Sequence, residues 1–124
     1  MWRRVRPIPG CFFLPGAESF QEVGWRPAAD VYRHPNGWLA KFDLAGVRPE
    51  EIQVHVQGRC LSVRGVRRDC LLEEGCCYES LEISYSSFER QLEFPVDLDN
   101  ARISTEYQLG MLLVRIQTED VKGA

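Results

Sequence analysis

The feature that most constrains the fold of this chain is a period-two alternation of apolar residues, in short runs that glycine or proline interrupts. Such alternation is typical of strands that bury one face. No segment of ten or more residues shows helical periodicity, so the chain is predicted to be an all-β, antiparallel β-sandwich. The alternating apolar residues are Trp38, Ala40, Phe42 and Leu44; Ile52, Val54 and Val56; Leu61 and Val63; Ile103, Tyr107 and Leu109; and Leu112, Val114 and Ile116.

Composition and charge bound the function. A length of 124 residues is enough for one domain. The net charge of −3, from 15 basic and 18 acidic residues, gives no reason to expect nucleic-acid binding. His34 and His55 are the two histidines, neither lies in a nucleophile motif, and no glycine-rich phosphate loop is present. The sequence predicts neither an enzyme nor a cofactor.

The cysteines and the apolar stretches indicate the compartment. The number of cysteines is odd, no C-x-x-C pair occurs, and no stretch is long enough for a signal-peptide core or a membrane span. We therefore expect reduced thiols, no disulfide framework, no metal site and a cytoplasmic protein. The five cysteines are Cys11, Cys60, Cys70, Cys76 and Cys77.

Three regions are expected: an arm at residues 1–26, a β-domain at 27–118 and a very short tail at 119–124. Proline is frequent in the arm, which argues against a long helix or strand there, yet its aromatic content is too high for an inert tail. Two interpretations stay open, namely packing on its own domain or a mobile arm that binds other proteins. The aromatic residues that would bind are Trp2, Phe12, Phe13 and Phe20.

Five segments, in one order, match the motifs of a known domain family. Residues 27–32 are similar to its first strand, and residues 43–54 (D-L-A-G-V-R-P-E-E-I-Q-V) to its D-L-P-G segment, with Ala45 where proline is common. Residues 61–65 (L-S-V-R-G) match L-x-I-x-G, and residues 88–95 match F-x-R-x-F-x-L-P. The most specific match is Ala101 with Gly110-Met111-Leu112, the signature A-x(8)-G-x-L. Together these segments resemble the α-crystallin domain of small heat-shock proteins, most closely the bacterial and plant type.

The resemblance implies an immunoglobulin-like sandwich and an ATP-independent holdase chaperone, which binds unfolding client proteins and prevents their aggregation under stress. Two other classes remain open. One is a co-chaperone adaptor with a related sandwich, which binds one folded partner, and the other is a redox sensor built on the cysteines. The signature and Arg90 argue against the adaptor, and the cysteine spacing gives little support to a sensor.

The resemblance also implies a dimer interface. Arg90 matches the family's interface arginine, although a charged stem that reaches water past the sheet edge is the alternative. Residues 64–82 resemble the long loop that carries a strand into the partner subunit, with residues 77–81 as the candidate strand, and a plain flexible loop is the alternative. Strand character returns at residues 83–85. The remaining candidates for the interface are Cys77, Tyr78 and Glu79 in the loop, with Val31 and Tyr32 on the first strand.

The last implied site is a hydrophobic groove for clients or tails. Its candidate residues are also candidates for the hydrophobic core. We expect them to belong mainly to the core and to form a groove where the core reaches the surface. Residues 119–124 contain no Ile/Val-x-Ile/Val anchor, so we expect a homodimer or small homo-oligomer, or a hetero-oligomer with a longer-tailed paralogue. The groove candidates are Ile52, Val54, Val56, Ile103, Thr105 and Tyr107.

Overall fold

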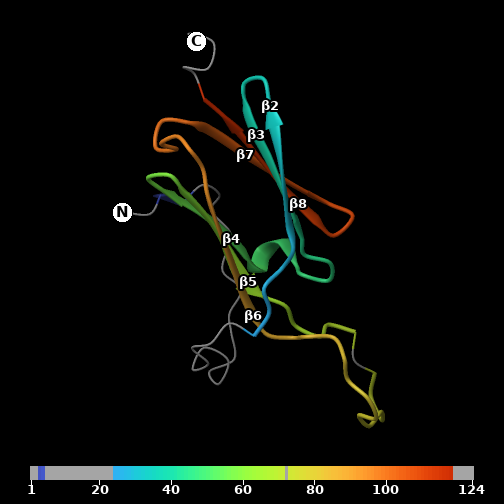
Figure 1. The fold of residues 1–124 in the computed structure, drawn as a ribbon. Coiled ribbons are helices and arrows are strands. Elements are labelled where there is room, and N and C mark those ends of the chain that lie inside the picture. Colours follow the sequence, from blue (N-terminus) through green and yellow to red (C-terminus); the bar gives the residue numbers. More distant parts are fainter. Residues whose placement is uncertain (1–2, 5–23, 72, 119–124) are drawn as a thin grey trace.

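Two four-stranded antiparallel sheets form the computed structural model, which describes residues 3–4, 24–71 and 73–118 (Figure 1). The first sheet has the strand order β1-β4-β5-β6 and the second the order β2-β3-β8-β7. Bounds in the first sheet are β1 Arg3–Arg4, β4 Ile52–Gln57, β5 Cys60–Val66 and β6 Ser87–Glu93. Bounds in the second sheet are β2 Ala29–His34, β3 Gly37–Asp43, β7 Arg102–Gln108 and β8 Met111–Gln117.

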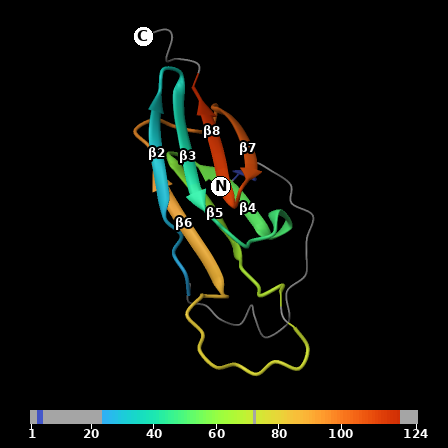
Figure 2. The same cartoon turned by 90° about the vertical axis from the view of Figure 1, so that its right-hand side faces the viewer.

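The hydrophobic core lies between the inner faces of the two sheets, which are stacked on each other in Figures 1 and 2. Strand β4 shows the pattern most simply, because Ile52, Val54 and Val56 are at most 2% exposed and alternate with half-buried polar residues. Aromatic rings close part of the core, since Trp38 packs edge-on against Phe94 with ring centroids 5.5 Å apart. The sandwich predicted from the alternation is confirmed.

The structure differs from the sequence prediction in three local places. Residues 83–85 are irregular, and β6 begins only at Ser87; within this stretch Ser84 O accepts a hydrogen bond from the Arg67 side chain at 2.8 Å. A 3₁₀ helix, η2, forms at Pro49–Glu51, with proline in its first position. A short strand that the sequence did not predict lies in the region expected to be the arm, since Arg3–Arg4 pairs with β4 opposite Val56 and His55.

At two positions of the sequence motifs, the backbone geometry explains why the residue is glycine. Gly110 has φ of +77° in the turn between β7 and β8, and it lies against the loop after β3, where Leu44 N–H donates to its carbonyl at 2.8 Å. Gly65 in β5 passes so close to η2 that an added Cβ would lie 1.9 Å from Glu51 O. In the same signature, Ala101 and Leu112 are both core residues.

Substituting Gly65 therefore tests the packing of η2 on β5. We expect Gly65→Ala to lower the free energy of unfolding by about 2–4 kcal/mol, because a backbone carbonyl has to move. Gly58→Ala is the control, since that turn glycine has φ of +60° but nothing within 4 Å of an added Cβ, and it should cost only about 1 kcal/mol. Equal losses in urea denaturation would contradict the steric explanation.

Candidate subunit and client interfaces

The edge strand β2 buries very little of itself. Its inner-face residue Val31 lies opposite the core residue Ala40 but is 47% exposed, and the outer-face residue Tyr32 is 44% exposed. Arg33 also lies on the inner face, where its guanidinium carbon is 4.5 Å from the Trp38 ring centroid. Among the residues that the structure describes, β2 therefore has one backbone edge without a strand partner, with apolar side chains beside it.

Arg90 lies on the inner face of β6, the edge strand of the other sheet, because its partner across the ladder is the core residue Val63. One guanidinium nitrogen, Nη1, donates to Pro27 O at 2.9 Å, just before β2 begins. Its Nε is buried and has no hydrogen-bond partner within the described residues. We call the side bounded by β2 and β6 the β2–β6 margin, and Arg90 holds a buried donor in it.

The long loop between β5 and β6, residues 67–86, extends away from the sandwich in Figures 1 and 2. The candidate strand at residues 77–81 is irregular here, as is the rest of the described loop. Several large apolar side chains along it are exposed to water. These residues, with their exposures, are Leu71 89%, Tyr78 75%, Leu81 67%, Ile83 60% and Tyr85 44%.

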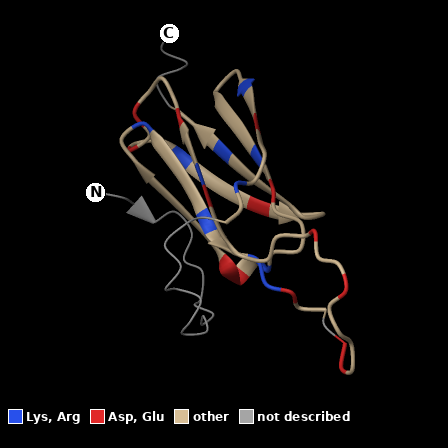
Figure 3. Cartoon of the chain, turned by 60° about the horizontal axis from the view of Figure 1, so that its bottom comes forward, with Lys and Arg blue, Asp and Glu red and all other residues tan. Residues whose placement is uncertain are grey.

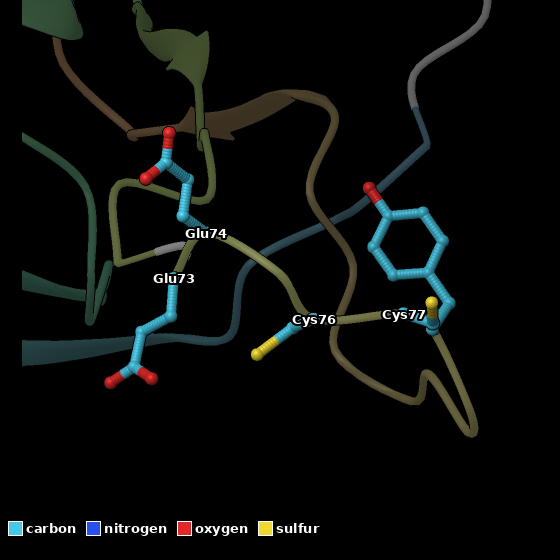
Figure 4. A pocket seen from close by; sticks show the side chains of 5 residues that line it. Glu73, Glu74, Cys76 and Cys77 are labelled. Atoms are coloured by element: carbon cyan, nitrogen blue, oxygen red, sulfur yellow. The ribbon is translucent and has the colours of Figure 1, made fainter.

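The loop cysteines do not form a defined site. Cys76 and Cys77 line a shallow pocket with Glu73, Glu74 and Tyr78, and Figure 4 shows the two thiols pointing in different directions. The described cysteines are free, and those in the loop are exposed. No group of three or more His, Cys, Asp or Glu side chains in the described part of the chain is arranged to hold a metal ion.

The opposite side, bounded by β4 and β7, holds the predicted groove residues. Ile52, Val54 and Val56 are fully core, whereas Ile103, Thr105 and Tyr107 on β7 face inward and are only half-buried. The two sets therefore meet at this side of the sandwich, with the β7 residues nearer to water. Strand β1 occupies the backbone edge of β4 there, opposite His55 and Val56.

Tyr107 fastens this side of the sandwich. Its hydroxyl donates to the carbonyl oxygens of Leu44 and Val47, at 2.9 and 2.7 Å, and so holds the loop after β3. Burial raises the pKa of the Tyr107 phenol above its ordinary value, and the negative charge of Asp43 raises it further. The neutral phenol is thus part of the folded structure.

Charge is mixed over the described surface. In Figure 3, basic and acidic residues occur on both sheets, while the tip of the 67–86 loop is acidic. None of the helical segments that the structure describes has the length and apolar character needed to cross a bilayer. The predicted client-binding aromatics Trp2, Phe12, Phe13 and Phe20 lie outside the described residues, as does the tail.

Sequence reasoning missed two features of these interfaces. It missed the pairing of Arg3–Arg4 with β4, for which two arginines carry no strand signal. It also missed Arg67, whose side chain contacts the loop and the segment before β2 at once. Sequence distance hides such a contact, because residues 25, 45, 67 and 84 meet only after folding.

Comparison with known proteins supports the same architecture. The profile of the Hsp20/alpha crystallin family matches residues 30–123. A 17.6 kDa class II heat shock protein of Arabidopsis thaliana is 34% identical over 72% of this chain and 59% of its own length, and a heat shock protein of Dictyostelium discoideum is 28% identical over 82% of this chain and 24% of its own. The crystal structure of hspA from Xanthomonas axonopodis superimposes with a TM-score of 0.64 at 29% sequence identity. The match covers 78% of this chain and 97% of that one.

Removal of the Tyr107 hydroxyl should destabilise the fold in a pH-dependent way. At pH 8 we expect Tyr107→Phe to lower the free energy of unfolding by about 1–3 kcal/mol, because buried carbonyls lose their donor. The folded pKa is raised, so the contribution of the phenol is complete below the unfolded pKa and is lost as pH rises through the folded one. The difference in the free energy of unfolding between Tyr107→Phe and wild type should therefore be smaller at pH 11 than at pH 8.

Urea denaturation at the two pH values measures this difference, with Tyr78→Phe as the exposed control. A difference in the free energy of unfolding that does not change with pH would contradict the prediction.

Proposed function

Since the chain belongs to the Hsp20/alpha crystallin family, we propose that it is an ATP-independent holdase, which binds partly unfolded proteins and keeps them from aggregating. The observation that carries the proposal is the uncovered apolar surface of the β2–β6 margin and the 67–86 loop, with Val31, Tyr32, Tyr78 and Leu81 all more than 40% exposed. A denaturing client exposes matching apolar surface and unpaired strands. The family supports a chaperone role, and no catalysis is proposed.

Binding of a client would not require ATP or any other energy source. Burial of apolar surface contributes roughly 25 cal/mol per Å², and this term would have to exceed the entropy lost on association for a complex to form. The bound client is removed from the pool of aggregating chains by mass action. The proposed client contacts are the apolar side chains of the β2–β6 margin and the 67–86 loop, where a second copy does not cover them, together with the half-buried β7 residues and the arm aromatics Trp2, Phe12, Phe13 and Phe20. We place this activity in the cytoplasm.

We further propose that two copies of the chain form a dimer through the β2–β6 margin. In this arrangement, residues 77–81 of one copy add as a strand to the free edge of β2 in the other, which supplies partners for unpaired backbone groups. Arg90 lies in this margin, where its Nη1 donates to Pro27 O just before β2, and it is the proposed interface arginine. Small homo-oligomers, and hetero-oligomers with a longer-tailed paralogue, would build on this dimer.

The holdase proposal predicts suppression of aggregation without nucleotide. At equimolar ratio, the protein should strongly reduce the light scattering of a heat-denatured client, equally with and without ATP. Leu81→Ser and Tyr78→Ser should weaken the effect, because they remove exposed apolar surface. Leu109→Ser is the matched control, since Leu109 is 94% exposed but lies in the β7–β8 turn. Unchanged turbidity in the presence of wild type would overturn the proposal.

The dimer proposal predicts a specific role for Arg90. Arg90→Ala should raise the dimer dissociation constant by about tenfold or more, because the carbonyl of Pro27, at the start of the proposed β2 contact, loses its charge-assisted donor. Arg115→Ala is the control, since Arg115 forms an exposed ion pair with Glu106 on the other sheet. Light scattering after size exclusion, over a range of concentrations, measures the change. Equal dissociation constants for Arg90→Ala and wild type would return Arg90 to a role within one subunit.

A further inference from the structure

Arg67 closes the base of the 67–86 loop. It is the first residue after β5, and its backbone N–H donates to Ser86 O at 3.0 Å, so the two ends of the loop are joined. The next residue adds a second anchor, because Arg68 Nε lies 2.8 Å from Oε2 of Glu51, whose side chain is 3% exposed. The loop therefore leaves the sandwich in a fixed direction.

The side chain of Arg67 ties this base to the sandwich. Its Nε donates to Ser84 O at 2.8 Å, and its Nη1 donates to Ala45 O at 3.1 Å. One guanidinium thus bridges the returning limb of the loop and the turn after β3. A planar fork with several donors makes such a bridge, which the single ammonium of lysine does not reproduce.

The same guanidinium also holds the segment that precedes β2. Its central carbon lies 3.6 Å from the Trp25 ring centroid and 5.8 Å from that of Tyr85. Trp25 packs in turn on Phe88 of β6, with centroids 5.3 Å apart. The preceding Gly24 is close as well, since an added Cβ would lie 2.5 Å from the Ser86 hydroxyl oxygen.

We propose that Arg67 is a positioning residue that couples the dimer-forming loop to the end of the N-terminal arm. Loop residues 84–86 and arm residues 24–25 contact one guanidinium and each other, so neither segment moves without the other. Addition of the loop to a second copy would then also fix the direction in which the arm leaves the sandwich. This inference rests on the proposed dimer for its consequence, but the coupling itself is a property of one chain.

Hydrogen–deuterium exchange of the full-length protein tests the coupling directly. Arg67→Ala should speed exchange by about tenfold both at residues 24–28 and at residues 84–87, because a cation–π contact and two hydrogen bonds are lost. Arg67→Lys should recover only part of this protection, and Arg115→Ala should change neither segment. Faster exchange in the loop alone, or in neither segment, would overturn the proposal.

A double-mutant cycle on the dimer dissociation constant then tests the consequence. Trp25→Leu keeps an apolar contact for Phe88 but removes the aromatic face, and it should weaken the dimer about as much as Arg67→Ala does. The double variant should be no weaker than either single variant, whereas independent contributions would multiply. If wild type forms no dimer at all, the proposed dimer fails, and the exchange experiment alone decides the coupling.

Discussion

The packing of the two inner sheet faces against each other determines which parts of the molecule stay uncovered. Core residues from β3, β4, β5 and β8 fill the space between the sheets, and β2 is left at the edge with almost no burial of its own. A strand with unpaired backbone groups and exposed apolar residues is a template on which another chain can pair. In the proposed dimer a second copy covers this edge, and in the proposed client complex an unfolding protein covers it.

The sequence motifs follow from the same packing. Gly65 is required where η2 crosses β5, and Gly110 where the β7–β8 turn meets the loop after β3. Arginines then act at the borders of the core, where a charged fork reaches backbone carbonyls: Arg90 reaches Pro27, and Arg67 reaches Ser84 and Ala45. The core thus specifies the sandwich, while these two side chains orient the segments proposed to bind partners.

The fold was largely predictable from the sequence, because alternation over a buried face is a local signal that the strands retain. The prediction that Ile52, Val54 and Val56 belong to the core is confirmed for the same reason. The start of β6 was not predictable, since residues 83–85 have strand-like side chains but their backbone position is set by Arg67. The groups proposed to bind partners stay proposals, because an interface is a property of two surfaces and the sequence specifies only one.

The central claim is that the β2 edge and the 67–86 loop form the contact between subunits. Hydrogen–deuterium exchange of the wild-type protein, at concentrations above and below its dimer dissociation constant, tests this claim most directly. Association should slow exchange in β2 and at residues 77–81, while the exchange of β7 stays the same. Protection on association that appears at β7 and leaves β2 unchanged would contradict the account.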